Sequence, residues 1–296
     1  MTKMCLRCII SSKERSFCFM PKVSFEKLKS ADYRLIAADI DGTLVPFGGQ
    51  MSEKSIKTIR ALSEKGYIFV LATGRPYAGV KGIIESCSLF AKPVIVYNGA
   101  EIYVGGKMVY SCVLPPDISE KICAEGRKVD AEIICWVDGK LYAEKESLFL
   151  TEYVSISKVA PIIVKDVSVL AESGVTKYLY MVEEERVKPL TKKMREVLPE
   201  VNVYSSRKRL IEFVPKECSK AEALKKVCEI VGVDKSRTVA LGDGENDIDM
   251  LKFAALAVAP ENASDEVKCE ADIICESADE DGAEKFLRRF LGVGNE

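Results

Sequence analysis

The sequence predicts an α/β fold, a doubly wound parallel sheet into which an α+β module is inserted. Three observations lead to this prediction. Short apolar runs that do not alternate with polar residues, such as residues 35–38, suit strands buried on both faces of a parallel sheet. Helical apolar patterns separate these runs in the first and last parts of the chain, as in βαβ units. The middle of the chain reads instead as hairpins and helices without that alternation.

The first part of the chain contains three predicted strands, at residues 35–38, 67–72 and 94–97. Ser52 is expected to cap the helix after the first strand, because a short polar side chain can accept a bond from the first turn. Gly66 is expected to end that helix, because glycine tolerates the left-handed conformation of a C-cap. Each strand ends in a small polar group. In sheets of this type, ligands bind outside the carboxyl ends of the strands.

The middle of the chain has a different rhythm. Two hairpins are predicted, at residues 101–110 and 133–143, and the Asp138-Gly139 pair of the second is typical of a type I′ turn. Asp117 is expected to cap a helix between them, with an acidic residue three positions on. Further strands and one helix continue this pattern to residue 214. Hairpins and helices without strict βαβ alternation indicate an α+β module.

The βαβ pattern then resumes and sets the domain boundaries. Strands are predicted at residues 238–241, 256–259 and 273–275, followed by a terminal amphipathic helix. The predicted division is an N-terminal extension at 1–30, an α/β core at 31–112 and 216–296, and the inserted module at 113–215.

Composition excludes several classes of function. The 296 residues are 48% hydrophobic and 30% charged, as in an ordinary globular protein that buries a core. The net charge is −2 without long blocks of like charge, so neither nucleic acid nor a membrane surface is an expected partner. The chain contains no histidine. This excludes Ser-His-Asp and Cys-His catalysis, and it leaves any metal site to carboxylates or thiolates.

The 11 cysteines, an odd number, lie mostly within apolar runs. This pattern indicates reduced, buried thiols, so a cytoplasmic location is expected. Cys5 and Cys8 form a CxxC pair without a second pair at zinc spacing, and they are not expected to bind metal. Residues 1–30 are basic and lack periodicity. They are expected to be poorly ordered. A translation start at Met20 would leave the first 19 residues out of the native protein; the alternative is an organelle-targeting arm, against which Glu14 counts.

Two carboxylates follow the first predicted strand directly. Asp39 and Asp41 are spaced i, i+2, so their side chains share one face of an extended segment and can address one point where the strand ends. Two converging carboxylates either bind a hard cation or divide the roles of acid and nucleophile, and phosphoryl transfer uses both. An EF-hand calcium loop is the alternative, but Gln50 stands at loop position 12, where that motif requires glutamate.

The decapeptide 35–44 resembles the first motif of the haloacid dehalogenase superfamily of phosphohydrolases, an apolar strand followed by Asp-x-Asp-Gly-Thr. Later motifs recur in that superfamily's order, namely Thr73-Gly74-Arg75, Lys220 and Gly242-Asp243-x-x-Asn246-Asp247. The chain is most similar to the Cof-like branch (type IIB), whose C2 cap is inserted between the Thr and Lys motifs. Ala221 departs from the glycine that usually follows the lysine, and Ala259-Pro260 replaces the usual Met-Gly.

The resemblance implies a Mg²⁺-dependent phosphomonoester hydrolase that works through an aspartyl-phosphate. Asp39 is then the nucleophile, and Asp41 protonates the leaving alcohol and later activates water. The expected metal-binding residues are Asp39, Asp41 (through its backbone carbonyl), Asp243 and Asp247. The expected phosphate-binding residues are Thr73, Gly74, Lys220 and Asn246. Asn246 and Asp247 are also expected to orient Lys220 and metal-bound waters.

The inserted module is expected to act as a lid that excludes water and selects the substrate. The candidate substrate-contacting residues are Arg75 and Asn98 in the predicted core, and Trp136, Asp138, Tyr142 and Arg207 in the inserted module. The alternative is that Trp136 belongs to the core of the module and that the other module residues are ordinary hairpin surface. The substrate is expected to be a small phosphorylated metabolite, such as a sugar phosphate.

Two other functions are compatible with parts of the pattern. A phosphomutase of the same superfamily shares the Asp-x-Asp nucleophile and the cap, but it returns the phosphoryl group to a sugar hydroxyl instead of water. A signalling receiver domain also groups aspartates, a threonine and a lysine around Mg²⁺ on a doubly wound sheet. Its phospho-accepting aspartate stands alone in mid-chain, however, and it has no inserted cap. A monomer or a weak homodimer is expected.

Overall fold

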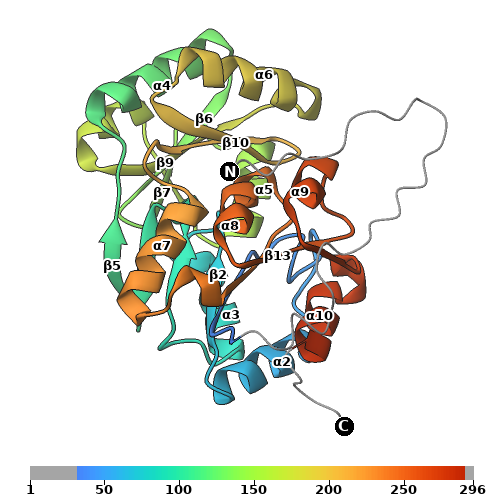
Figure 1. Cartoon of the computed structure of the whole chain (residues 1–296). Coiled ribbons are helices and arrows are strands. Elements are labelled where there is room, and N and C mark those ends of the chain that lie inside the picture. The colour runs from blue at the N-terminus through green and yellow to red at the C-terminus, as the bar shows by residue number, and fades with distance from the viewer. Residues whose placement is uncertain (1–31, 291–296) are drawn as a thin grey trace, which may run out of the picture.

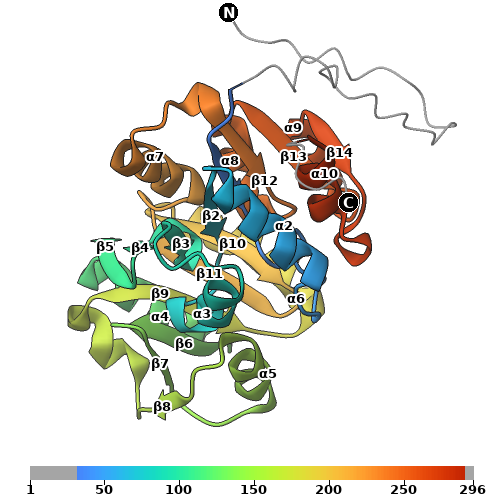
Figure 2. The same ribbon diagram turned by 90° about the horizontal axis from the view of Figure 1, so that it is seen from below.

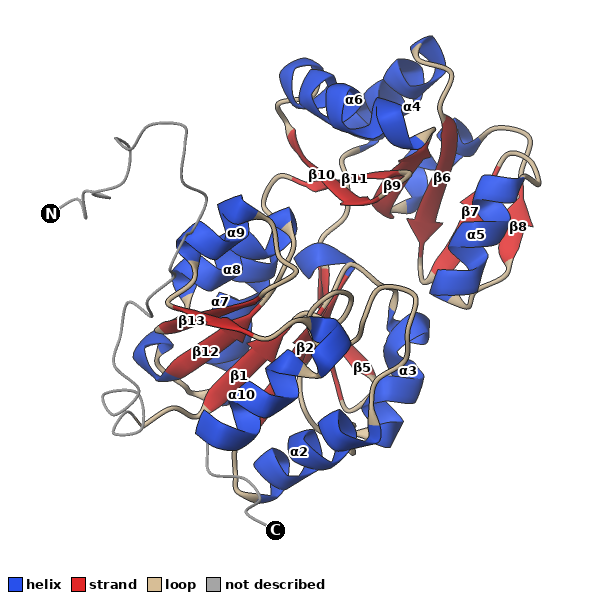
Figure 3. Cartoon of the chain, turned by 90° about the vertical axis from the view of Figure 1, so that its right-hand side faces the viewer, coloured by secondary structure: helices blue, strands red, loops and turns tan. Residues whose placement is uncertain are grey.

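The computed structural model describes residues 32–290, without the side chains at positions 206, 207 and 290. Within this range the chain forms one sheet of eight strands and one of six (Figures 1 and 3). The predicted fold class is confirmed: an α/β core built on a parallel sheet carries an inserted α+β cap. The predicted extension at 1–30, with Cys5 and Cys8, lies outside the described residues. No helix between residues 32 and 290 has the length and apolar composition needed to cross a bilayer.

The larger sheet has the strand order β14-β13-β12-β1-β2-β3-β4-β5. Its strands are β1 (Leu35–Ala38), β2 (Ile68–Ala72), β3 (Val94–Val96), β4 (Glu101–Val104), β5 (Lys107–Ser111), β12 (Thr238–Leu241), β13 (Leu256–Pro260) and β14 (Ile273–Cys275). The strands from β14 to β3 pair in parallel, whereas β4 and β5 add an antiparallel hairpin at one edge.

Strand β1 is the topological switch point of this sheet. The chain leaves β1 toward β2 and β3 on one side, and it returns after the cap to β12, which pairs with β1 on the other side. In open α/β sheets the ligand site lies outside the carboxyl ends of the strands at such a point. Asp39 follows β1, and Gly242-Asp243 follows β12, so both predicted acidic motifs lie at this crevice.

Helices cover both faces of the larger sheet (Figures 2 and 3). One face packs against α2 (Glu53–Glu64), α3 (Tyr77–Ser86) and α10 (Gly282–Phe290); the other packs against α7 (Lys220–Val231), α8 (Ile248–Phe253) and α9 (Asp265–Glu270). In β1, Ile36 and Ala38 belong to the first apolar cluster, whereas Leu35 and Ala37 belong to the second. All four are fully buried, which is why this strand reads as a continuous apolar run.

The smaller sheet has the order β10-β11-β9-β6-β7-β8. Its strands are β6 (Glu132–Val137), β7 (Lys140–Ala143), β8 (Pro161–Ile163), β9 (Val175–Met181), β10 (Val201–Arg207) and β11 (Leu210–Pro215). Helices α4 (Pro116–Lys128) and α6 (Glu184–Val197) cover its outer face, and α5 (Leu148–Ser157) lies beside β7 and β8 (Figure 3). The opposite face is turned toward the larger sheet. Short 3-10 helices are η1 (Tyr97–Gly99), η2 (Val167–Ser173), η3 (Lys235–Arg237), η4 (Glu245–Asp247) and η5 (Ala278–Glu280).

Most of the predicted caps and turns are confirmed. The Ser52 side chain accepts a hydrogen bond from the backbone N–H of Ser55, and the Asp138-Gly139 turn has the two positive φ angles of a type I′ hairpin. The predicted cap of α4 is wrong. That helix begins at Pro116 with Pro115 in the N-cap position, so Asp117 lies inside the first turn. Proline is favoured as the first helical residue because its fixed φ is already helical and its missing N–H is not needed there.

Two helical glycines should respond in opposite directions to alanine. A Cβ on Gly126 in α4 would lie 2.7 Å from Ile133 Cδ1 and 2.8 Å from Tyr180 Cε1, whereas a Cβ on exposed Gly82 in α3 would meet no atom within 4 Å. We expect Gly126→Ala to lower the free energy of unfolding by about 1–3 kcal/mol through overpacking. Gly82→Ala should raise it by about 0.5–1 kcal/mol through helix propensity. Chemical denaturation measures both, and equal effects would contradict the packing of α4.

Candidate active site

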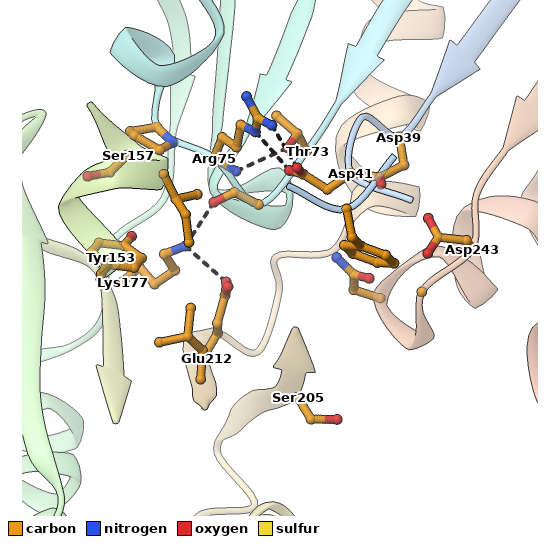
Figure 4. A pocket seen from close by; sticks show the side chains of 17 residues that line it. Asp39, Asp41, Thr73, Arg75, Tyr153, Ser157, Lys177, Ser205, Glu212 and Asp243 are labelled. Atoms are coloured by element: carbon orange, nitrogen blue, oxygen red, sulfur yellow. Dashed lines mark hydrogen bonds and ion pairs between the residues drawn. The ribbon is translucent and has the colours of Figure 1, made fainter. Parts of the chain in front are cut away.

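The candidate site lies where the carboxyl ends of β1, β2 and β12 meet the inner face of the cap sheet. A cavity of about 90 Å³ opens there and is lined from both sides (Figure 4). Lining residues from the core lie in the segments that follow these strands and include Asp39, Asp41, Thr73, Gly74, Arg75, Asp243 and Asn246. Lining residues from the cap include Tyr153, Ser157, Lys177, Ser205 and Glu212. The structure thus brings together residues that are more than two hundred positions apart in the chain.

Lys220 occupies the start of α7, directly after Ser219, which caps that helix. Its Nζ donates to Asp39 Oδ1 at 2.5 Å and to Asp247 Oδ1 at 2.6 Å, and its side chain is fully buried. Burial alone would lower the pKa of the ammonium, but the carboxylates of Asp247 and Asp39 outweigh it and raise that pKa. Lys220 therefore remains a cation between the two acids.

Three buried carboxylates meet beside this ammonium. Asp39, Asp243 and Asp247 each place an oxygen within 4.8 Å of the others. Burial raises the pKa of Asp39 well above its usual range, although Lys220 opposes this shift. Burial, together with the Asp247 carboxylate, raises the pKa of Asp243 to about 7. The protein groups described here therefore leave negative charge uncompensated, which either a proton or a further cation can balance.

The donors in this cluster fit Mg²⁺. All are carboxylate oxygens, the ligands preferred by a hard cation, and the sequence contains no histidine that would favour zinc. Both oxygens of Asp247 already accept hydrogen bonds from the protein: Oδ1 from Lys220, and Oδ2 from the backbone N–H groups of Asp243 and Gly244. Asp39 and Asp243 are thus better placed than Asp247 to bind a cation directly.

The loop after β1 approaches Asp243 closely. Thr43 donates from Oγ1 to Asp243 Oδ1 at 2.6 Å. Gly42 has a φ of 88°, and a Cβ at this position would lie 2.2 Å from Asp243 Oδ2. Only glycine permits both the backbone conformation and this approach. Sequence reasoning assigned no role to Thr43, although its place in the Asp-x-Asp-Gly-Thr motif was the signal that could have identified it.

Asp41 is held by Arg75 instead of the acidic cluster. The guanidinium donates from Nε to Asp41 Oδ2 at 2.7 Å and from Nη2 to Asp41 Oδ1 at 2.6 Å, a two-bond pairing (Figure 4). The backbone N–H of Arg75 donates to Thr73 Oγ1 at 3.1 Å. Arg75 was predicted to contact substrate. In the structure it lines the cavity, and its guanidinium orients the Asp41 carboxylate.

Asn98 and Asn246 form a hydrogen-bonded pair at the rim of the site. Asn246 Nδ2 donates to Asn98 Oδ1 at 2.8 Å, and Asn98 Nδ2 donates to Glu212 Oε2 at the same distance. The Asn98 side chain is fully buried and does not line the cavity. It was predicted to contact substrate, but in this structure it connects Asn246 of the core with Glu212 of the cap.

Three predicted cap residues, Trp136, Asp138 and Tyr142, do not line the cavity. Trp136 is fully buried, donates from Nε1 to Tyr153 Oη at 2.8 Å, and packs against Tyr97 with ring centroids 5.5 Å apart. The predicted substrate contact by Trp136 is therefore not seen, because its ring fills the junction between cap and core. Asp138 is exposed in its hairpin turn, and Tyr142 packs against the cap core. The Arg207 side chain is outside the described part of the structure.

Lys177 and Glu212 are the cap residues that sequence reasoning missed. They lie on β9 and β11, on the face of the cap sheet turned toward the site, and both are almost fully buried. The available signal was a single charged residue within each of two otherwise apolar strands. Lys and Glu are almost never fully buried unless paired.

Comparison with known proteins gives consistent matches along almost the whole chain. A family model described as haloacid dehalogenase-like hydrolase matches residues 36–287. The 5-amino-6-(5-phospho-D-ribitylamino)uracil phosphatase YitU of Bacillus subtilis is 27% identical over 268 residues, covering 88% of this chain and 98% of that protein. A putative phosphatase of Streptococcus pyogenes is 27% identical, covering 87% and 98%. The structure of TM0651 from Thermotoga maritima is 30% identical, with a TM-score of 0.75, and covers 87% and 97%.

The acidic cluster predicts how stability depends on pH and metal. Without metal, the pKa of Asp243 rises from 3.8 to about 7 on folding. The folded state therefore binds a proton at Asp243 more tightly than the unfolded state. The stability that this protonated carboxyl contributes is fully present below about pH 4 and is lost as the pH rises through about 7. In EDTA at about pH 8 we expect Asp243→Asn to melt at a higher temperature than wild type, because the wild-type carboxylate is then ionised and uncompensated. Each kcal/mol of stability gained should raise the melting temperature by roughly 2–4 °C. At about pH 5 the difference should shrink, because the wild-type carboxyl is protonated there.

Thermal melts with and without Mg²⁺ provide the check. Mg²⁺ at the higher pH should raise the melting temperature of wild type and leave that of Asp243→Asn almost unchanged. Asp234→Asn is a matched control, because Asp234 is an exposed acid remote from the cluster, at the start of η3. If wild type gained stability relative to Asp243→Asn as the pH rose in EDTA, the arrangement of the cluster would be refuted.

Proposed function

Because the chain belongs to the haloacid dehalogenase-like hydrolases, and is a phosphatase of that family, we propose that it is a Mg²⁺-dependent hydrolase of a small phosphorylated metabolite. The observation that supports this most directly is the Lys220 ammonium shared by Asp39 and Asp247, with Asp243 beside them. A phosphomonoester dianion repels an incoming carboxylate, so positive charge must surround the point of attack. This cluster supplies the nucleophile, a fixed cation and oxygen ligands at one position.

Asp39 is the proposed nucleophile. One of its carboxylate oxygens attacks phosphorus, the bond from phosphorus to the leaving oxygen breaks, and an aspartyl-phosphate forms. Lys220 and Thr73 offset the charge on the other phosphoryl oxygens, together with the backbone N–H of Gly74. Asn246 borders the same cavity and contributes its amide. Water then attacks phosphorus, the bond to Asp39 breaks, and inorganic phosphate leaves.

Asp41 is the proposed acid and base. It gives a proton to the leaving oxygen in the first step and takes one from the attacking water in the second. Arg75 fixes the carboxylate of Asp41 by two hydrogen bonds, so we propose Arg75 as its positioning residue. This pairing also keeps the Asp41 side chain away from the metal ligands, which agrees with a metal contact through its backbone carbonyl alone.

Mg²⁺ would be held by Asp39, Asp243 and the Asp41 carbonyl, and when bound it would neutralise phosphoryl charge. The residues of the chain do the remaining work of binding and orientation. Asp247 orients Lys220 and the backbone after β12, and Thr43 orients Asp243. Of the predicted metal-binding residues, Asp247 is therefore assigned to orientation.

The cap is the proposed lid and selects the substrate. We propose the division given above, with residues 31–112 and 216–296 as catalytic core and 113–215 as cap. A second cavity of about 710 Å³ shares Phe47, Tyr153, Ile156 and Leu210 with the catalytic cavity, which gives room for a leaving group of the size of a sugar or polyol. The name of the Bacillus subtilis relative, a phosphatase of a phosphoribityl compound, supports a substrate of this class.

The eight cysteines between residues 32 and 290 are free thiols, which supports a cytoplasmic location.

A phosphatase assay with trapping of the intermediate tests the proposal. Incubation with sugar and polyol phosphates and Mg²⁺ should release inorganic phosphate without any bisphosphate activator; a strict need for the activator would indicate a phosphomutase. Rapid quenching with a labelled substrate should place the phosphate on Asp39. Asp39→Asn should bind substrate and turn nothing over. Label on any residue other than Asp39 would overturn the assignment.

The role of Asp41 can be separated from metal binding. Asp41→Asn should leave Mg²⁺ affinity nearly unchanged and lower kcat for alkyl phosphates by ~10²–10⁴-fold, because a proton transfer is lost. The loss in the first step should be smaller for aryl phosphates, whose leaving groups need no proton, so aspartyl-phosphate should accumulate with them. Quench-flow kinetics and Mg²⁺ titration measure both. Loss of Mg²⁺ binding, with equal damage to both substrate classes, would make Asp41 a side-chain metal ligand.

A further inference from the structure

A buried lysine of the cap makes direct contact with the catalytic core. Lys177 lies on β9, and only 1% of its surface is exposed. Its Nζ donates to Glu212 Oε2 on the neighbouring strand β11 at 2.9 Å and to the backbone carbonyl of Gly74 at 2.8 Å (Figure 4). Gly74 belongs to the core loop that follows β2. One side chain thus bridges the two sheets.

The partner of this lysine reaches a second core loop. Glu212 Oε2 accepts from Asn98 Nδ2 at 2.8 Å, and Asn98 follows β3. Asn98 in turn accepts from Asn246 Nδ2, which lies in the loop after β12. The Lys177–Glu212 pair therefore touches the loops after β2 and β3 directly and the loop after β12 through Asn98.

These loops carry the reacting groups. Gly74 stands between Thr73, a proposed phosphate ligand, and Arg75, which holds the carboxylate of Asp41. The two loops are also joined by backbone bonds: the N–H of Asn98 donates to Thr73 O at 3.0 Å, and the N–H of Tyr97 donates to Arg75 O at 3.1 Å. A shift of Gly74 or Asn98 would therefore move the groups that bind phosphate and orient the acid.

We propose that Lys177 and Glu212 are positioning residues that couple closure of the cap to the arrangement of the catalytic loops. With the cap closed, Lys177 fixes Gly74 and Glu212 fixes Asn98. With the cap open, the Gly74 carbonyl loses its donor Lys177, and Asn98 Nδ2 loses its acceptor Glu212. The site is complete only in the closed state, which excludes bulk water during turnover. This inference rests on the proposed function for its kinetic consequences.

The chemistry of the pair explains why apolar side chains would not serve. An apolar contact between cap and core is non-directional and tolerates sliding, whereas a buried ammonium and carboxylate must each find their acceptor and donor. The junction already has apolar contacts from Trp136, Tyr97 and Tyr153. The ion pair adds direction, because Lys177 donates to one defined core atom, the Gly74 carbonyl oxygen, and Glu212 accepts from another, Asn98 Nδ2.

The test separates coupling from simple structural support. We expect Lys177→Met and Glu212→Gln each to lower kcat for a sugar phosphate by ~10²-fold with a small change in KM, as expected when catalytic groups are misplaced. Without any substrate, amide exchange at Thr73, Tyr97 and Asn98 should become about tenfold faster or more. Lys177→Arg, which retains a donor, should restore part of both. Lys121→Met is the control, because it removes the exposed cap ion pair with Glu200 at 3.0 Å. Neither kcat nor exchange should change in this control.

The double variant Lys177→Met/Glu212→Leu gives the deciding result. Replacing both charges leaves no unpaired buried ion, so its melting temperature should return close to that of wild type. Its kcat and its amide protection should stay low. If kcat and amide protection both returned to the wild-type values together with the melting temperature, the pair would be structural only and the inference would be overturned. If wild type hydrolyses no phosphomonoester, the proposed function fails, and the exchange data alone still decide whether the pair holds the loops.

Discussion

The buried ammonium of Lys220 is the interaction on which the rest of the site depends. It lies between Asp39 and Asp247, at 2.5 and 2.6 Å, and the lysine itself is almost fully buried. Carboxylates packed this closely repel one another, and burial removes the water that would otherwise screen them. Removing one partner of a buried ion pair typically costs ~3–5 kcal/mol, because the other charge is left uncompensated. The cluster is thus stable only with its lysine in place, and it still attracts a further cation.

The parallel sheet explains how such a cluster can form. Strand ends of a parallel sheet meet at one edge, so short loops after β1 and β12 bring Asp39 and Asp243 together at the switch point. Helix α7 packs over the same edge and places Lys220 at its first turn. Lys220 is part of a helix, and Asp39 and Asp243 lie within two residues of the strand that precedes each of them. The geometry therefore depends on the packing of the sheet more than on the loops themselves.

The cap sheet completes the site from the opposite side. Its outer face packs against α4 and α6, whereas its inner face has Trp136 in the junction with the core and presents Lys177 and Glu212 to the site. A single strand such as β9 thus serves both faces through its alternating side chains. Lys177 pairs in register with Trp136 on β6, so the directional polar contact and the apolar filling lie side by side.

The sequence by itself determined the fold class and pointed to the charged residues that the structure gathers at the candidate site. Continuous apolar runs reveal strands buried on both faces, and Asp39, Asp41, Lys220 and Asp243 follow strands or begin helices at fixed points of a motif. Only the tertiary structure decided that α5 borders the cavity, because its apolar residues follow no helical stripe that a pattern could reveal. It also decided that Trp136 fills a junction and that Lys177 and Glu212 reach the core. These contacts join strands of two sheets across a domain junction, and local periodicity carries no information about which distant residues pack together.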